Sequence, residues 1–235
     1  MESKLKTLTL TDRKSLIESL IQSGYAFAAW SMPQSRSVMM IISLTDASQT
    51  EKQLSEMDSG FLVNEFASNH PIRPYFISAD ILIKDEQLSL DPKAKASEID
   101  ELISSIDTQE IGKRDQVSET ISASEGNNFI DAVEAAVQEI RNGEFEKVVL
   151  SRTKDLPLPE DFNAWELFTA VNEKYVNAFC SLSFIPGKGV WIGATPELLI
   201  SDDTERFKTV SLAGTKGLEN DQELSEIAWT QKEIE

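Results

Sequence analysis

Apolar residues recur at helical spacing near the start of the chain and then alternate at strand spacing. Leucine and isoleucine lie three and four residues apart after Thr11, and the run ends at Gly24, which predicts an amphipathic helix with Thr11 as its N-cap. Short apolar or alternating runs follow, separated by residues typical of turns. Strands are therefore expected over residues 25–30, 38–44, 60–63 and 74–83.

Acidic residues dominate the middle of the chain. Aspartate and glutamate recur over residues 84–126, where aromatic residues are scarce, so this stretch is expected to be a solvated connector. Isoleucine and leucine at helical spacing predict one short helix over residues 97–106. Residues 112–127 have the composition of a disordered segment. We therefore expect an N-terminal α+β region over residues 1–111 and the start of a second region over residues 128–235.

The second region alternates between helical and strand spacing. Apolar residues after Asn128 fall on one helical face as far as Gly143, and these two residues are the candidate cap and end of a helix. Another helix is expected over residues 161–175. Further strands are expected over residues 145–152, 179–184, 190–193, 197–201 and 207–212. Consecutive strands with tight turns and interspersed helices indicate the α+β class with antiparallel sheets.

The strand predicted over residues 145–152 places a lysine among hydrophobic residues. Alternation puts Phe145, Lys147 and Val149 on one face. A lysine in such a position is either an edge residue whose ammonium reaches water or a base held in a site, because desolvation makes an ammonium easier to deprotonate. The strand taken alone favours the first interpretation.

Composition narrows the class of protein. With 235 residues, of which 40% are hydrophobic, the chain can bury a core as one large domain or two small ones. The net charge of −18 and the lack of a basic patch in the sequence argue against nucleic acid as a partner. No apolar run approaches the roughly 20 residues that a bilayer requires, and no signal segment is recognisable, so no membrane partner and a cytoplasmic location are expected.

Cysteine and histidine, the residues most used for nucleophilic and zinc chemistry, are rare. The single cysteine, Cys180, lies in a predicted strand and is expected to be a buried, unreactive thiol. The single histidine, His70, stands beside Pro71 in a stretch typical of loops. A histidine-ligated metal site or a Ser-His-Asp triad is therefore hard to build.

Three segments of the second region carry motifs. They are Phe145-Glu146-Lys147-Val148-Val149-Leu150-Ser151-Arg152, Trp191-Ile192-Gly193-Ala194-Thr195-Pro196-Glu197-Leu198-Leu199-Ile200 and Ser211-Leu212-Ala213-Gly214-Thr215-Lys216. Each is weak alone, but the three in this order resemble the chorismate-utilising enzymes, which include isochorismate, salicylate, anthranilate and aminodeoxychorismate synthases. The resemblance implies a sandwich of antiparallel sheets with flanking helices, and chorismate as the substrate.

The residue before the two valines separates members of that family. The members that use ammonia typically carry glutamine there, whereas the members that use water carry lysine, as Lys147 does here. Water needs a base before it attacks a ring carbon, while ammonia is already a nucleophile. The resemblance therefore implies isochorismate synthase, an isomerase (hydroxymutase) of menaquinone or siderophore biosynthesis, with no glutamine amidotransferase subunit.

The resemblance also implies roles for single residues. Lys147 would be the base that takes a proton from water attacking C2, and Glu197 the acid that protonates the departing C4 hydroxyl. Backbone amides at the end of a predicted strand would meet a substrate carboxylate, in Leu212, Ala213, Gly214 and Thr215. Without the resemblance, Glu197 is better explained as a solvated edge residue, and Gly214 is equally well explained as a plain turn residue.

A divalent cation and a longer chain are implied as well. Mg2+ would bridge the dicarboxylate substrate and acidic ligands. The family's first metal glutamate lies on a helix after the Ala-Gly-Thr segment, and the matching frame places it just beyond the last residue. No metal ligand is therefore expected within the chain, unless the register shifts by one and selects Glu235. The helix predicted over residues 221–235 stops without a cap, which leads us to expect the first part of a longer enzyme, with the C-terminal part of its fold missing.

Two other functions fit the same residues. Salicylate synthase shares the lysine and differs by eliminating pyruvate from isochorismate in the same site. A truncated, non-catalytic chorismate-binding domain would keep the motifs without turnover. Product analysis separates the first alternative from isochorismate synthase, and titration with chorismate and Mg2+ addresses the second.

Overall fold

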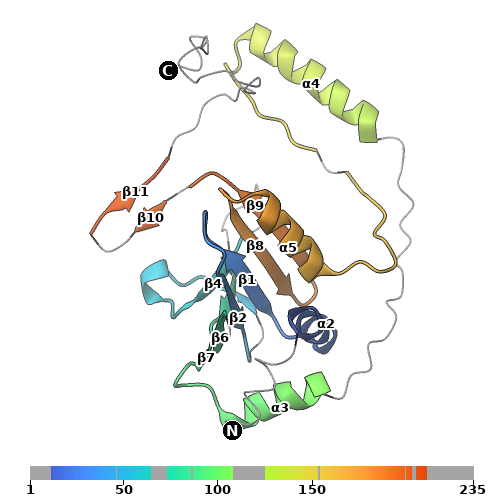
Figure 1. Ribbon diagram of the computed structural model, residues 1–235. Coiled ribbons are helices and arrows are strands. Elements are labelled where there is room, and N and C mark those ends of the chain that lie inside the picture. The colour runs from blue at the N-terminus through green and yellow to red at the C-terminus, as the bar shows by residue number, and fades with distance from the viewer. Residues whose placement is uncertain are drawn as a thin grey trace, which may run out of the picture. The chain divides into compact units, whose positions relative to one another are not determined.

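The computed structural model describes residues 12–45, 47–64, 73–85, 87–107, 125–152, 154–198, 200–202 and 205–210. The described residues form two compact units (Figure 1). One unit comprises residues 12–107 together with residues 163–210, and the other comprises residues 125–162. The first unit thus joins the N-terminal region to the strands that follow residue 163.

A six-stranded antiparallel sheet forms the centre of the first unit, in the order β7-β6-β2-β1-β8-β9. Its strands are β1 (Phe27–Ser31), β2 (Val38–Ile42), β6 (Ile81–Lys84), β7 (Gln87–Leu90), β8 (Phe179–Ile185) and β9 (Gly189–Thr195). β1 lies between β2 and β8, and its register with β8 places Phe27 opposite Phe184 and Ser31 opposite Cys180. The sheet is therefore built from segments far apart in the sequence, and β7 and β9 are its edges.

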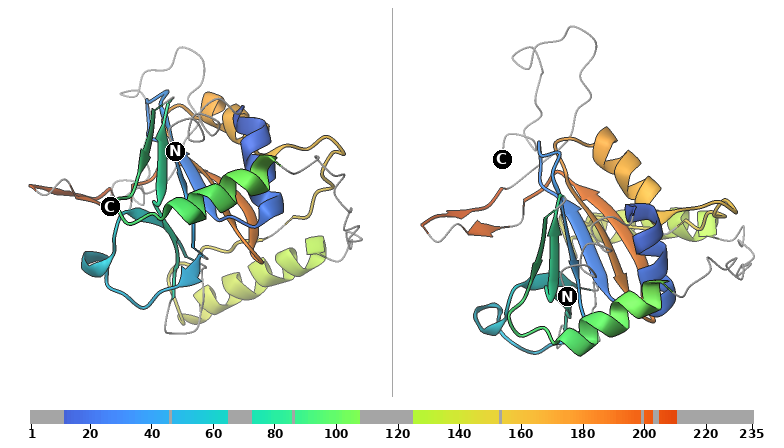
Figure 2. Two further views of the ribbon diagram at one scale, coloured as in Figure 1. Left: turned by 90° about the horizontal axis from the view of Figure 1, so that it is seen from below. Right: turned by 60° about the horizontal axis from the view of Figure 1, so that its bottom comes forward.

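Helices cover one face of this sheet. Figure 2 shows α2 (Arg13–Ser23), α3 (Ala96–Asp107) and α5 (Ala164–Lys174) on the same side of the strands, with α2 in contact with both of the others. Leu16, Ile17 and Leu20 of α2 and Phe168 of α5 are fully or almost fully buried. The buried Asn163 caps α5 and also donates to the Glu18 carboxylate, which ties α5 to α2.

A smaller sheet lies against the other face. It has the order β3-β5-β4 and consists of β3 (Ser48–Gln49), β5 (Tyr75–Ser78) and β4 (Gly60–Val63); the short helix η1 (Leu54–Glu56) precedes β4. Ala28 and Ile41 of the large sheet form one apolar core with Ile77 of the small sheet. The ring centroids of Trp30 and Phe61 lie 5.5 Å apart beside this core. The α+β class with antiparallel sheets is confirmed, and the family's complete sandwich stays a prediction.

A partly buried hydrogen-bond network joins the two sheets. The hydroxyl of Ser43, which follows β2, lies 2.7 Å from the hydroxyl of Ser78 in β5. The Asp80 carboxylate accepts from the Ser78 hydroxyl at 2.7 Å and from the backbone N–H of Leu44 at 2.7 Å. Asp80 therefore supplies the acceptors that these inward-facing donors require.

The second unit contains α4 (Glu125–Asn142) and an extended segment that follows it. The predicted strand over residues 145–152 is wrong for the described structure, which assigns no strand to these residues and leaves Val149 81% exposed. The physical reason is that a strand is stabilised by hydrogen bonds to a partner, and the described part of this unit offers none. The helix also begins at Glu125 rather than after Asn128, and it ends at Gly143 as predicted, with a φ of 82°.

Several other boundaries differ from the predictions by small shifts. Asp12, not Thr11, caps α2, because its carboxylate accepts from the N–H groups of Lys14 and Ser15; a hydrogen bond from the Ser15 hydroxyl is the main reason that the pKa of Asp12 is lowered. The strand predicted over residues 74–83 is two strands, β5 and β6, separated by the turn that holds Asp80. The helix predicted over residues 97–106 is confirmed as α3.

The predictions for the last third of the chain are confirmed in part. The strands over residues 179–184 and 190–193 are present as β8 and β9. The strands expected over residues 197–201 and 207–212 are reduced to a short ribbon, β10 (Ser201–Asp202) and β11 (Phe207–Lys208). The expected segments over residues 112–124 and 211–235 lie outside the described residues. Among the helices that are described, none has the length and apolar character needed to cross a membrane.

Two strand glycines provide a matched test of close packing between neighbouring strands. A Cβ on Gly60 would collide with the Phe76 ring and the Ile77 carbonyl, whereas a Cβ on Gly193 would lie 3.7 Å from the Ser181 hydroxyl, an ordinary contact. We predict that Gly60→Ala lowers the free energy of unfolding by about 1–3 kcal/mol. Gly193→Ala is expected to change it by less than about 1 kcal/mol. Urea denaturation followed by circular dichroism measures both values, and equal effects would contradict the close packing at Gly60.

Candidate functional site

Lys147 lies in the extended segment of the second unit. Its side chain is exposed, and so are its neighbours Phe145 and Val149. The described part of this unit therefore does not enclose the ammonium in an apolar setting, and it gives Lys147 no hydrogen-bond or ion-pair partner. The role of Lys147 as a base stays a prediction.

Glu197 lies in the first unit, two residues after the end of edge strand β9. Pro196 cannot donate a hydrogen bond to a neighbouring strand, which is consistent with the strand ending at Thr195. The Thr195 hydroxyl accepts from the backbone N–H of Glu197 at 3.2 Å and lies 3.4 Å from the Glu197 carbonyl oxygen. These contacts fix the backbone at Glu197, while its carboxylate is exposed and binds no other described residue.

A hollow of about 520 Å³ opens beside Pro196. Its walls come from the end of α5, from the turn after it and from β9, and they are formed by Lys174, Tyr175, Val176, Asn177, Ala178, Ala194 and Pro196. Lys174 is the one charged residue of this wall, and its ammonium lies 5.3 Å from the centroid of the Tyr175 ring. The hollow therefore combines an ammonium with apolar surface next to the residue that precedes Glu197.

Lys174 is a residue that the sequence reasoning missed. It occupies the last turn of α5, where a basic residue is favoured by the helix dipole. That signal indicates a helix end and says nothing about a binding site. Its position in the hollow follows from the pairing of β8 with β9, which brings Ala194 opposite Cys180.

The indole of Trp191 is a second feature that the motif did not reveal. Trp191 is 60% exposed, and its Nε1–H donates to the Lys188 carbonyl at 3.1 Å. Trp191, Gly193 and Thr195 project from the same face of β9, because side chains alternate along a strand. This part of the motif therefore presents a fixed aromatic ring on an open edge of the sheet.

The remaining predicted site residues cannot be assigned positions. Leu212, Ala213, Gly214 and Thr215 lie outside the described residues, as does Glu235. Within the described ranges, no group of three or more histidine, cysteine, aspartate or glutamate side chains is arranged to hold a metal ion. The described residues therefore offer no site that fits Mg2+.

Comparisons with known proteins identify relatives of this chain. The family model described as chorismate binding enzyme matches residues 6–231. Among curated proteins, isochorismate synthase MenF of Escherichia coli (strain K12) is 31% identical over 83 residues, which cover 35% of this chain and 19% of that protein. The matched stretch thus spans about a fifth of the curated relative. No solved structure matches the chain significantly.

Cys180 provides a test of how well the structure buries the side chains of β8. The thiol is buried, as the sequence predicted, and burial raises its pKa. We predict that Cys180 reacts with Ellman's reagent at pH 8 roughly 100-fold or more slowly than an exposed thiol, because it must wait for local opening. The matched control is Asn177→Cys in a Cys180→Ser background, since residue 177 is exposed nearby. Equal rates for the two thiols would contradict the burial of Cys180.

Proposed function

We propose a function on the premise that this chain belongs to the family of chorismate-binding enzymes, whose model matches residues 6–231. The proposed activity is that of an isochorismate synthase, an isomerase that converts chorismate to isochorismate. The observation that carries the proposal is Lys147, because lysine at this position distinguishes the members that use water from those that use ammonia. The similarity to isochorismate synthase MenF supports the same reaction.

The proposed reaction needs a base and an acid. Lys147, as the neutral amine, takes a proton from the water that attacks C2 of the ring. Glu197, as the neutral carboxylic acid, gives a proton to the C4 hydroxyl, which leaves as water. One water enters and one leaves while the ring double bonds shift, so the formula of the substrate is unchanged. Lys147 and Glu197 would act on opposite faces of the ring.

The surroundings of Glu197 support its part in the proposal. Its backbone is held by Thr195, while its carboxylate has no other described partner and is free to meet a substrate. The nearby ammonium of Lys174 lines a hollow of about 520 Å³, which is large enough for a small molecule. An ammonium in such a hollow is suited to attract a dicarboxylate such as chorismate.

The other predicted components are part of the same proposal. Backbone amides of Leu212, Ala213, Gly214 and Thr215 would receive a substrate carboxylate, as the resemblance implies. Mg2+ would be required, with ligands other than the residues described above. Water as the nucleophile means that no glutamine amidotransferase subunit is needed to deliver ammonia. The product would serve menaquinone or siderophore biosynthesis.

The residue at position 147 provides the direct test. We predict that Lys147→Ala, made in the protein expressed from its complete reading frame, lowers the rate of isochorismate formation by about 100- to 10,000-fold, because a general base is lost. Lys147→Gln is expected to lose the reaction with water and to form an aminated product when ammonium is supplied. Liquid chromatography with mass spectrometry, after incubation in 18O-labelled water, measures both outcomes.

The matched control is Lys154→Gln, which removes an exposed lysine of the same unit. It is expected to keep the wild-type rate and to incorporate label from water. Near-normal isochorismate formation by Lys147→Ala would remove Lys147 from the role of base. Salicylate as the final product of the wild-type protein would establish salicylate synthase in place of isochorismate synthase.

Removal of metal tests the proposed requirement for Mg2+. We predict that dialysis against EDTA abolishes turnover of chorismate and that added Mg2+ restores it, because Mg2+ would bridge the dicarboxylate substrate and the acidic ligands that the resemblance implies. The thermal unfolding midpoint of the first unit is expected to be unchanged, since its described residues form no metal cluster. Full activity in the presence of EDTA would contradict the requirement.

A further inference from the structure

The two edges of the six-stranded sheet differ in how they are protected. β7 is four residues long and alternates exposed polar residues with half-buried leucines. β9 is seven residues long, over Gly189–Thr195, and it contains no charged side chain. Short length and polar or charged side chains normally prevent the edge of a sheet from adding another strand. β7 has this protection, and β9 does not.

The outer side of β9 is open in the part of the chain that the structure describes. β9 pairs with β8 on one side, and no described strand pairs with it on the other (Figure 1). In an edge strand, about half of the backbone N–H and C=O groups point away from the neighbouring strand and need another partner or water. A further antiparallel strand would satisfy these groups with a regular ladder of hydrogen bonds.

The sequence of β9 is complementary to itself in one antiparallel register. The register that pairs all seven residues with those of a second copy places the two-fold axis at Ile192. Trp191 of one copy then lies opposite Gly193 of the other. Residues that lie directly opposite point to the same face of a sheet, so the glycine leaves space for the indole. An aromatic residue across from a glycine stabilises an edge that the glycine alone would weaken.

The indole of Trp191 is already held in place for such a contact. Its Nε1–H donates to the Lys188 carbonyl at 3.1 Å, and the residue is 60% exposed. Gly193 is exposed as well, and the nearest atom to a Cβ built there is the Ser181 hydroxyl oxygen, at 3.7 Å. The indole of a second copy therefore meets no described obstacle above Gly193, and pairing would remove two exposed indoles from water.

Charges at the two ends of β9 are complementary in the same register. Lys188 immediately precedes the strand, Glu197 lies two residues after its end, and both side chains are exposed. With the two-fold axis at Ile192, Lys188 of one copy lies opposite Pro196 of the other, one residue away from Glu197. The lysine side chain is long enough to cover this offset. Two attractive pairs of opposite charge therefore form in each dimer.

We propose that the 235-residue chain forms a dimer in which β9 pairs with β9 of a second copy, with the two-fold axis at Ile192. Each copy contributes one strand of seven residues, fewer than the roughly 20–30 residues per side of a stable interface, so the dimer depends on concentration. An ammonium beside Glu197 favours the carboxylate form, so the dimer withholds the neutral acid of the proposed reaction. Only this last consequence rests on the proposed reaction.

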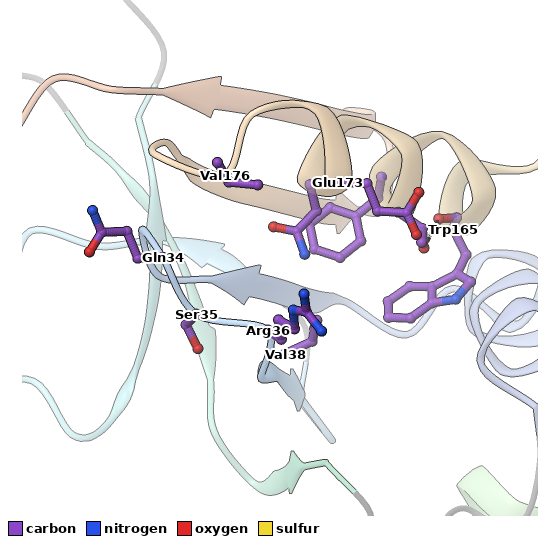
Figure 3. A pocket seen from close by; sticks show the side chains of 10 residues that line it. Gln34, Ser35, Arg36, Val38, Trp165, Glu173 and Val176 are labelled. Carbon is purple, nitrogen blue, oxygen red and sulfur yellow. Dashed lines mark hydrogen bonds between the residues drawn. The ribbon is translucent and has the colours of Figure 1, made fainter.

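Charged residues remote from β9 provide matched controls. Arg36 and Glu173 lie on two sides of a hollow of about 590 Å³ between α5 and the connection from β1 to β2, beside Trp165 (Figure 3). The Gln34 N–H donates to the Val176 carbonyl at 2.7 Å, which holds this connection against the turn after α5. None of the residues that line the hollow belongs to β9, and β1 and β8 separate β2 from β9. Variants in the hollow therefore change the charge without altering the proposed contact.

Sedimentation velocity of the 235-residue chain, from low micromolar to near-millimolar concentration, measures the dimer. The wild-type chain is expected to change from monomer to dimer over this range. Trp191→Lys is expected to weaken the dimer by about ten-fold or more, because it removes the indole and places a charge on the edge. Phe207→Lys is the matched control, since it replaces an aromatic residue that is 76% exposed outside β9, and it should keep the wild-type dissociation constant.

Two outcomes of this experiment would overturn the proposal. A wild-type chain that stays monomeric throughout would indicate that the outer side of β9 is covered within one chain. Equal weakening by Trp191→Lys and Phe207→Lys would indicate unspecific association of exposed aromatic residues. Circular dichroism of each variant verifies that the fold is retained.

Exchange of charges tests the register. Lys188→Glu is expected to weaken the dimer by about five-fold or more, because two attractive pairs become repulsive. The double variant Lys188→Glu and Glu197→Lys should restore the dimer, since the pairs form again with their charges exchanged. The matched controls are Arg36→Glu and the double variant Arg36→Glu and Glu173→Lys, which change the net charge equally and should keep the wild-type dissociation constant. Equal weakening by Lys188→Glu and by its double variant would overturn the proposed pairing.

Discussion

The pairing of β1 with β8 is the interaction on which the first unit depends. It joins strands from the beginning of the chain to strands from the end in one sheet, with Phe27 opposite Phe184 across the pair. The two rings lie 5.9 Å apart between their centroids, so the backbone pairing and the side-chain packing support each other. Because β9 follows β8 in a hairpin, this register also fixes the strand end from which Glu197 emerges.

The same pairing positions α5 and both hollows. α5 ends shortly before β8 begins, so the register of β8 determines where the helix meets the connection after β1. The bond from the Gln34 N–H to the Val176 carbonyl is possible because of that register. The hollow beside Pro196 and the hollow beside Trp165 therefore both border the turn at residues 174–178, and Val176 of this turn lines both.

Sequence patterns predicted those elements whose stabilising contacts are local. The helix α3 follows from its own apolar spacing, and β8 and β9 follow from alternation with a tight turn between them. The cap of α2 was misplaced by one residue because threonine and aspartate are both good caps, and only the structure shows that Asp12 reaches the free N–H groups. The strand predicted around Lys147 is wrong for the described residues, because alternation indicates which face of a strand would be apolar and not whether a partner strand is present.

The candidate site shows the same difference between features set by local sequence and features set by distant segments. Glu197 was predicted to begin a strand over residues 197–201, whereas the structure places it two residues after the end of β9 and assigns only Ser201–Asp202 to the next strand. The positions of Lys174 and Arg36 were not predicted, because each lines a hollow made by segments that are distant in sequence. Neither hydrophobic periodicity nor a short motif indicates which distant segments of a chain lie side by side.

The distance in sequence between β1 and β8 also affects how the chain folds while it is being synthesised. A ribosome adds roughly 5–20 residues each second, so β8 emerges on the order of ten seconds after β1. During that interval β1 can pair with β2, while the edge that will receive β8 stays open. An open edge beside Phe27 and Ala29 is a surface to which another nascent chain can add. The nascent protein is therefore expected to need protection by a chaperone until its last strands are synthesised.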